Sequence, residues 1–227
     1  MRFADPRPDG RAIVYAAIQA DPLVQRCADA LAVATTGQRT LARAVMNGEP
    51  GEPGEWRVMF PTLFGSAVPA AERAASETLL ALALEVAARG DETRSQVRGA
   101  IVEALAERLV ARRTTPVRRE RRVLFDGVPS EIHPYDLTVE PEQGMAEAWD
   151  CKWGARGIRA DVLHQLDDAR RHAADEGTAL LVGLVVFDAR RSCEVRLLRE
   201  RGPVAAGAVK LVALERLDRL AGGRAPA

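Results

Sequence analysis

The stretch EIHPYDLTVEPEQGMAEAWDCKWG, residues 131–154, decides how the rest of the chain is interpreted. Apolar and polar residues alternate in 131–139 and again in 145–153, which is the period of a strand with one buried face. The residues between these two segments, EPEQG, are typical of a turn. We therefore expect the two segments to pair as neighbouring strands of one sheet.

The second of these strands predicts its own orientation. One face carries the large apolar side chains of Trp149, Cys151 and Trp153, so it is expected to pack into the core. Asp150 and Lys152 point together to the other face. Lys152 is one of only two lysines in a chain with thirty arginines, so its place beside an acid needs an explanation. The simplest is an ion pair on the surface of an α/β domain.

Asp136 supports a second explanation. It lies on the polar face of the first strand, and hairpin pairing brings it to the same side of the sheet as Asp150 and Lys152. Two carboxylates side by side are unfavourable unless a cation neutralises them. Such hard oxygen ligands suit Mg²⁺ or Mn²⁺, and the compact ammonium of Lys152 can hold an attacking water or a phosphate oxygen. The pattern therefore indicates metal-assisted chemistry at phosphate.

The flanking segments predict the fold class. A helix is expected at 92–113 and a strand at 121–127, before the two strands already described. A strongly amphipathic helix at 157–177 follows, then a continuously apolar strand at 179–188 and an alternating strand at 193–200. This order of elements predicts an α/β domain with a central mixed sheet flanked by helices.

The other parts of the chain read mainly as helix. Residues 1–90 are expected to form a helical N-terminal region, and residues 91–227 the α/β domain. The segment GEPGEPGEW, 48–56, predicts a loop or linker because it is rich in Pro and Gly. The segment LVALERLDRLAGG, 211–223, predicts a short terminal helix.

The composition is typical of a soluble globular protein, with 47% hydrophobic and 28% charged residues and a formal net charge of zero. No apolar run approaches the ~18 residues of a membrane span, and the N-terminal residues lack an apolar signal core. A cytoplasmic location and no membrane partner are therefore expected. The three scattered cysteines suggest neither a disulfide framework nor a zinc or iron–sulfur site.

Positive charge is concentrated in RLVARRTTPVRRERR, 108–122, which holds seven arginines and a single acid. Such a run can follow a phosphate backbone, and a solvated arginine-rich surface is the alternative. The nucleic-acid-binding candidates from this run are Arg112, Arg113, Arg118 and Arg119. Arg98, on the preceding helix, is a further candidate.

These residues resemble the PD-(D/E)xK nuclease superfamily, which has the restriction-endonuclease-like fold. The resemblance covers about residues 92–200 and rests on Asp136, on the run Asp150-Cys151-Lys152, and on the order of elements. It implies that Asp136 and Asp150 bind the metal and that Cys151 contributes only its backbone carbonyl. Lys152 would then position the water that attacks phosphorus. One residue separates Pro134 from Asp136, so the Pro-Asp pair of the family is not contiguous here.

The resemblance also implies roles for two helices. Glu103 resembles the helix glutamate that completes such a metal site through water, and Glu107, one turn later, is the alternative. Gln165 resembles a glutamine on the helix after the lysine strand, where it contacts nucleic acid. It belongs to a polar stripe of that helix, whose other members are Asp161, Asp168 and His172.

The expected function is a Mg²⁺- or Mn²⁺-dependent DNA endonuclease acting in restriction, phage defence or DNA repair, with RNA left open as a substrate. The helical N-terminal region would provide a homodimer contact, target recognition or a partner interface. A catalytically inactive nucleic-acid-binding or scaffold protein on the same fold is the alternative. A surface ion pair in an unrelated α/β domain is the third possibility.

Overall fold

The computed structural model describes residues 1–5, 10–48, 51–114, 116–129, 134–140, 144–205 and 207–222. The chain forms two compact units. The sheet unit comprises Met1–Asp9 and Ala106–Ala227, and the helical unit comprises Gly10–Leu105. The division falls inside a helix at 105/106 and not at 90/91, and the first residues of the chain belong with the sheet.

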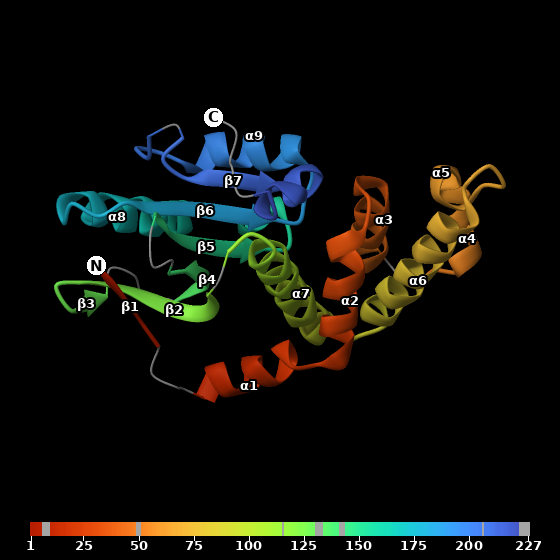
Figure 1. The fold of residues 1–227 in the computed structure, drawn as a ribbon. Helices are drawn as coiled ribbons and strands as arrows, with labels where there is room; N and C mark the ends of the chain where they lie inside the picture. The colour runs from red at the N-terminus through yellow and green to blue at the C-terminus, as the bar shows by residue number, and fades with distance from the viewer. Residues whose placement is uncertain are drawn as a thin grey trace. The chain divides into compact units, whose positions relative to one another are not determined.

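The sheet unit is built on a mixed β-sheet with the order β1-β2-β4-β5-β6-β7, in which the short β3 pairs with β2 (Figure 1). The strands are β1 (Arg2–Ala4), β2 (Val117–Phe125), β3 (Val128–Pro129), β4 (Tyr135–Val139), β5 (Ala146–Lys152), β6 (Leu180–Val186) and β7 (Lys210–Ala213). Neighbouring strands are antiparallel from β1 to β5, while β5, β6 and β7 run parallel. The expected α/β class and mixed sheet are confirmed.

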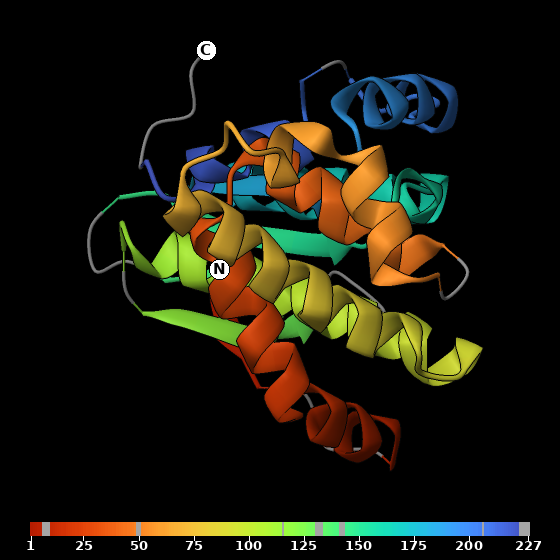
Figure 2. The ribbon, with the colours of Figure 1, turned by 90° about the vertical axis from the view of Figure 1, so that its right-hand side faces the viewer.

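Helices connect the parallel strands, as parallel pairing requires. After β5 the chain forms the short 3-10 helix η1 (Ala155–Gly157) and then α8 (Ala160–Asp175), which leads to β6. α9 (Arg190–Glu200) leads from β6 to β7. Figure 2 shows α8 and α9 to the same side of the strands, and both contribute to one apolar core cluster with the sheet. This cluster fixes α8 over the face of β5 that carries Ala148.

Residues 193–200 form part of α9, so the strand predicted there is wrong. Cys193 is fully buried and Leu197, one helical turn later, packs against the same cluster, whereas Val195 is 61% exposed. A strand would have placed Val195 on the same face as Cys193. The apolar residues therefore follow the helical period, and the strand that pairs with β6 comes from later in the chain.

That later strand corrects a second prediction. Residues 211–223 were expected to be helical, but Lys210–Ala213 form β7 and Leu214–Leu220 form the 3-10 helix η2. The first part is extended because it pairs with Gly183–Val186 of β6. Backbone hydrogen bonds to the edge of a sheet thus outweigh the local helical preference of the segment.

The helical unit contains α1 to α6 and most of α7. Their bounds are α1 (Gly10–Gln19), α2 (Pro22–Val33), α3 (Thr36–Asn47), α4 (Pro53–Met59), α5 (Pro61–Phe64), α6 (Ala70–Ala87) and α7 (Asp91–Ala111). α7 is the helix expected at 92–113, and its last residues belong to the sheet unit. The loop expected at 48–56 ends earlier than predicted, because Pro53 begins α4 at a position where proline is favoured.

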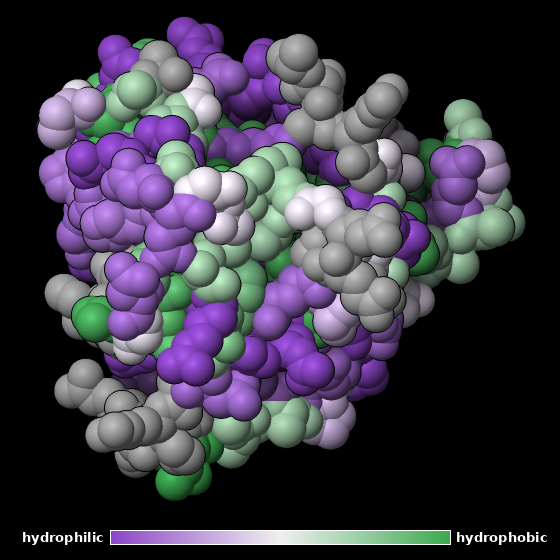
Figure 3. All heavy atoms as spheres, turned by 60° about the vertical axis from the view of Figure 1, so that its left-hand side comes forward, coloured by the Kyte–Doolittle hydropathy of each residue, from purple (hydrophilic) through white to green (hydrophobic). Residues whose placement is uncertain are grey.

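Among the described residues, no helix combines the length and apolar character that crossing a membrane requires. Figure 3 shows one face of the molecule, on which hydrophilic side chains are interspersed with smaller apolar areas. The large apolar side chains that stay exposed come from several elements, including Val33, Val58, Val128 and Val195. Three pairs of them are neighbours along the chain: Ile13 with Val14, Val58 with Met59, and Val195 with Leu198 one helical turn later.

Candidate metal and phosphate site

Asp136 and Asp150 come from the paired strands β4 and β5. In this antiparallel pair Leu137 lies opposite Trp149 and Thr138 opposite Ala148. The pairing ends at Leu137 and Trp149, and Asp136 and Asp150 are the next residues of the two strands. Both acids line one cavity, and the backbone N–H of Cys151, which follows Asp150, donates to Oδ2 of Asp136. The two carboxylates are therefore neighbours.

Each carboxylate has a defined partner. Oδ2 of Asp136 accepts a hydrogen bond of 2.5 Å from the backbone N–H of Cys151. Nζ of Lys152 donates to Oδ1 of Asp150 at 2.7 Å and lies 2.7 Å from Oδ2. The side chains of Lys152 and Asp150 are only 26% and 15% exposed. Interactions between these charges are therefore screened less by water than those of an ordinary surface ion pair.

The charge state of Lys152 follows from its neighbours. Burial alone would lower its pKa, but the carboxylates of Asp150 and Asp136 and the hydrogen bond to Asp150 outweigh burial and raise the pKa well above its usual value. Lys152 is thus a protonated donor at neutral pH. In this state it can hold and orient a water or a phosphate oxygen, but it cannot accept a proton.

The segment after β5 holds the stem of Lys152 in place. A Cβ added at Gly157 would lie 2.8 Å from Cδ and 2.9 Å from Cβ of Lys152, so the stem lies directly against the backbone of η1. The carbonyl of Lys152 accepts a hydrogen bond of 2.9 Å from the N–H of Phe187. The carboxylate of Asp188 accepts one of 2.9 Å from the N–H of Ala155. These contacts fix the turn that follows the lysine.

A cavity of about 490 Å³ opens beside these groups. Its lining includes Asp136 of β4, Asp150 and Lys152 of β5, Arg156 and Gly157 of η1, Arg159, and Val162, Gln165 and Leu166 of α8. Three strand residues and one helix residue singled out from the sequence thus border one space. β4 and β5 supply the charged floor, and α8 supplies one wall.

The donor set fits a cation that takes few protein ligands. Among the described residues, no three His, Cys, Asp or Glu side chains are placed to hold one metal. Asp136 and Asp150 provide two carboxylates. Oδ2 of Asp150 is buried and accepts no hydrogen bond from the described residues, although it lies near Lys152. Mg²⁺ commonly binds through one or two carboxylates and keeps several waters, so these residues fit it.

The helix acids proposed for the site have other contacts. Glu103 belongs to the helical unit, where its buried carboxylate accepts hydrogen bonds from Tyr15 at 2.5 Å and from Gln19 at 2.8 Å. Glu107 lies in the sheet unit and forms an ion pair with Arg119. Each acid is therefore already engaged within its own unit.

The predicted arginines divide into structural and exposed groups. The guanidinium of Arg113 makes two hydrogen bonds to the carboxylate of Glu147, at 2.8 and 2.5 Å, and Trp149 donates to the same carboxylate. Arg119 is held by Glu107, whereas Arg112 and Arg118 are exposed.

Arg98 lies in the helical unit, where it hydrogen-bonds to the carbonyl of Met46 and to the side chain of Asn47. Burial lowers the pKa of its guanidinium. Of the arginines considered for nucleic-acid binding, Arg98, Arg113 and Arg119 therefore have structural contacts.

Sequence reasoning missed Arg156 and Arg159, which line the cavity. The only available signal was their position: both follow Lys152 closely and interrupt the pattern between the strand and the next helix. In a chain with thirty arginines, that signal does not distinguish them from the rest.

The residues of the polar stripe of α8 have different surroundings. Gln165 borders the candidate site, Asp161 pairs with Arg159, and His172 packs against the ring of Phe125. Asp168 borders a second cavity of about 510 Å³.

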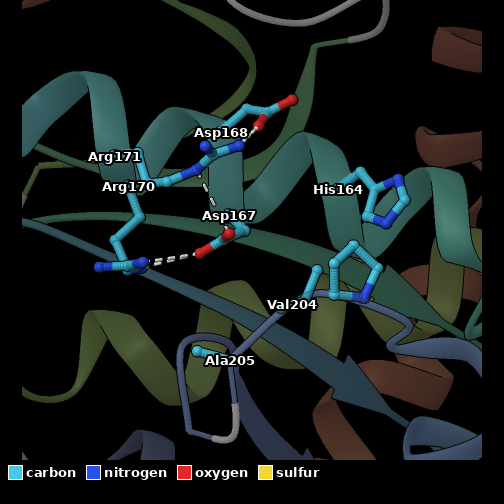
Figure 4. Close-up of a pocket in the computed structure, with 8 residues that line it drawn as sticks. His164, Asp167, Asp168, Arg170, Arg171, Val204 and Ala205 are labelled. Carbon is cyan, nitrogen blue, oxygen red and sulfur yellow. Dashed lines mark hydrogen bonds and ion pairs between the residues drawn. The ribbon is translucent and has the colours of Figure 1, made fainter.

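Figure 4 shows this second cavity. There Asp167 contacts Arg170 at 2.7 Å and Arg171 at 3.4 Å, and Asp168 also pairs with Arg171. The carboxylates of the second cavity are therefore neutralised by arginines of the same helix. His133, in the first of the two predicted strands, lies outside the described residues.

No protein-family model, curated protein or solved structure matches this chain. The function is therefore argued from the site itself.

Proposed function

We propose that this protein is a metal-dependent phosphodiesterase, and specifically a DNA endonuclease of the PD-(D/E)xK type. One observation carries the proposal: Asp136, Asp150 and Lys152, from two paired strands, border one cavity together with Gln165. A surface ion pair would not explain why a second carboxylate lies opposite the pair, or why all three groups are largely shielded from solvent.

Different groups of the chain would have different roles in phosphodiester hydrolysis. Asp136 and Asp150 would hold Mg²⁺ or Mn²⁺, with the carbonyl of Cys151 as a further oxygen ligand. When bound, the cation would stabilise the negative charge that develops on the phosphate oxygens. Lys152 would orient the attacking water through its ammonium group, which donates hydrogen bonds and accepts none.

Nucleic acid is the substrate class that the cavity favours. Arg156, Arg159 and Gln165 supply hydrogen-bond donors around the charged floor, and phosphate oxygens accept such bonds. DNA as the substrate, and restriction, phage defence or repair as the setting, are part of the proposal. The helical unit would supply a dimer contact, a target-recognition surface or a partner interface.

Plasmid cleavage tests the proposal. Supercoiled plasmid, linear DNA and RNA are incubated with the protein and Mg²⁺ or Mn²⁺. Lys152→Met and Asp150→Asn should lose cleavage. The matched control is Lys210→Met, which alters the chain's other lysine, outside the cavity lining, and should retain it. Equal cleavage by Lys152→Met and wild type would contradict the assignment.

A wild type that binds DNA but cuts no substrate with either metal would favour the inactive nucleic-acid-binding alternative. Cleavage of RNA but not DNA would keep the phosphodiesterase chemistry and replace the substrate. Binding and cleavage therefore need to be measured on the same preparations.

A further inference from the structure

We infer that Arg156 binds a phosphate group of the nucleic-acid substrate beside the one that is cleaved. The inference rests on the proposed function and adds a substrate-positioning residue to the same site. It is argued from the anchoring of η1, the contact between Gly157 and Lys152, and the distribution of charge around the cavity.

Arg156 stands on an anchored turn. On one side of it, the N–H of Ala155 donates to Oδ2 of Asp188 at 2.9 Å. On the other side, the carbonyl of Ile158 accepts a hydrogen bond of 3.0 Å from Nε of Arg196. The backbone that carries Arg156 is thus tied to the turn after β6 and to α9. An arginine on a fixed backbone loses less conformational freedom when it binds a ligand than one on a mobile loop.

The same turn brings Arg156 next to the chemistry. Gly157, the following residue, lies against the stem of Lys152, so close that an added Cβ would overlap it. Arg156 and Lys152 both line the 490 Å³ cavity. A phosphodiester chain that places one phosphate at Asp150 and Lys152 would therefore pass within reach of an arginine held by this turn.

Charge distinguishes Arg156 from the other cations of the cavity. Lys152 is paired with Asp150 at 2.7 Å, and Arg159 is paired with Asp161 at 2.7 Å. The Arg156 side chain is exposed and has no hydrogen bond or ion pair with any residue that the structure describes. Of the lining residues, it is thus the cation whose charge no described acid offsets.

A guanidinium in this position matches phosphate. Its planar fork can donate two parallel hydrogen bonds to phosphate oxygens, which a lysine cannot reproduce. The two carboxylates on the cavity floor repel a polyanion, so a cation at the rim helps to admit the backbone. The contact would bind any sequence equally, because phosphate carries no base information.

The test compares DNA binding by wild type, Arg156→Ala, Arg156→Lys and Arg191→Ala. Arg191 is an exposed arginine of α9 outside the cavity lining, so it controls for loss of one positive charge. A short labelled DNA duplex is titrated by fluorescence anisotropy over a range of salt concentrations, with Ca²⁺ in place of Mg²⁺. Cleavage is then measured with Mg²⁺ to separate KM from kcat.

Arg156→Ala should weaken binding about tenfold, as expected for a charge-assisted hydrogen bond. It should also reduce the slope of log affinity against log salt by about 0.9, the value for one phosphate contact on duplex DNA. Arg156→Lys should keep the slope but lose part of the affinity, and Arg191→Ala should match wild type. In cleavage, Arg156→Ala should raise KM more than it lowers kcat.

The possible failures are distinguishable. If wild type cleaves DNA and Arg156→Ala binds with unchanged affinity and slope, the inference is wrong and the proposed function stands. If wild type binds through Arg156 but does not cleave with Mg²⁺ or Mn²⁺, the phosphate contact of Arg156 stands and the nuclease assignment is wrong. If wild type neither binds nor cleaves DNA, both are wrong. An equal loss in Arg191→Ala would also overturn the inference, since it would show only a general charge effect.

Discussion

Asp136 accepts a hydrogen bond of 2.5 Å from the backbone N–H of Cys151, the residue between Asp150 and Lys152. This carboxylate therefore has two roles. It tethers the start of β4 to β5, and it adds a second negative charge to the cavity that Asp150 lines. A substitution can separate the two roles, because an asparagine keeps a carbonyl oxygen that can accept the same bond.

Asp136→Asn is expected to fold with nearly wild-type stability and to lose metal-dependent cleavage, because the acceptor remains and the charge does not. Asp136→Ala should lose cleavage and also about 1–3 kcal/mol of stability, since it leaves a buried N–H without its acceptor. Urea unfolding and plasmid cleavage on the same preparations check both statements. Wild-type cleavage by Asp136→Asn would exclude this carboxylate as a metal ligand.

Gly157→Ala should damage the site through Lys152. The added Cβ would lie 2.8–2.9 Å from three carbon atoms of the lysine stem, so the stem must move away from its position beside Asp150. We expect cleavage to fall at least tenfold while the far-ultraviolet circular dichroism spectrum is retained. Gly154→Ala is the matched control, because its Cβ would meet Asp188 at an ordinary 3.5 Å. Equal activity of the two variants would show that the path of the stem is not important.

Divalent cations should stabilise the folded protein independently of catalysis. A cation that binds only the native state raises the free energy of unfolding by about 2.7 kcal/mol at a hundredfold excess over Kd. We therefore expect Mn²⁺ or Ca²⁺ to raise Tm of wild type and to have no such effect on Asp150→Asn. Differential scanning fluorimetry with chelator-treated protein measures this. The same shift in both proteins would place the cation elsewhere.

Arg113 is expected to contribute to stability and not to DNA binding. The side chains of Arg113 and Glu147 are 15% and 11% exposed, and they form a bidentate pair. Arg113→Ala leaves Glu147 buried without this cation, so we expect a loss of about 3 kcal/mol. The adjacent Arg112 is exposed, and Arg112→Ala should cost little stability. Denaturant unfolding compares the two; a larger loss for Arg112→Ala would refute this assignment.

The buried thiol of Cys27 is expected to make the helical unit less stable at alkaline pH. Burial raises the pKa of its thiol from 9.0 to about 12, and the nearby Arg26 lowers it only partly. Between these values the unfolded chain loses a proton that the folded chain keeps. The contribution of Cys27 to stability is therefore fully present below pH 9 and is lost as the pH rises toward 12. Cys27→Ala should show a shallower decline over this range. Rapid alkylation of Cys27 in the native protein at pH 8 would contradict its burial.

Part of the site could be predicted from the residues alone. The alternation of 145–153 assigned Asp150 and Lys152 to one face because successive side chains of a strand point to opposite faces, and the structure has them in one ion pair. Hairpin pairing predicted Asp136 on the same side, and the structure has it lining one cavity with Asp150 and Lys152. The prediction was less successful for residues 193–200. This short segment has too few apolar residues to distinguish the period of a strand from that of a helix.

The sequence by itself determined which residues share a face, because the periods of strand and helix depend only on local backbone geometry. It therefore determined the strand that carries Asp150 and Lys152 and the α/β class. Only the tertiary structure decided the partners of each charge. Arg113 and Arg119 form ion pairs with acids of the folded chain, whereas Arg156 lines the cavity without a described partner. The physical reason is that an ion pair depends on distances across the fold, which local periodicity does not specify.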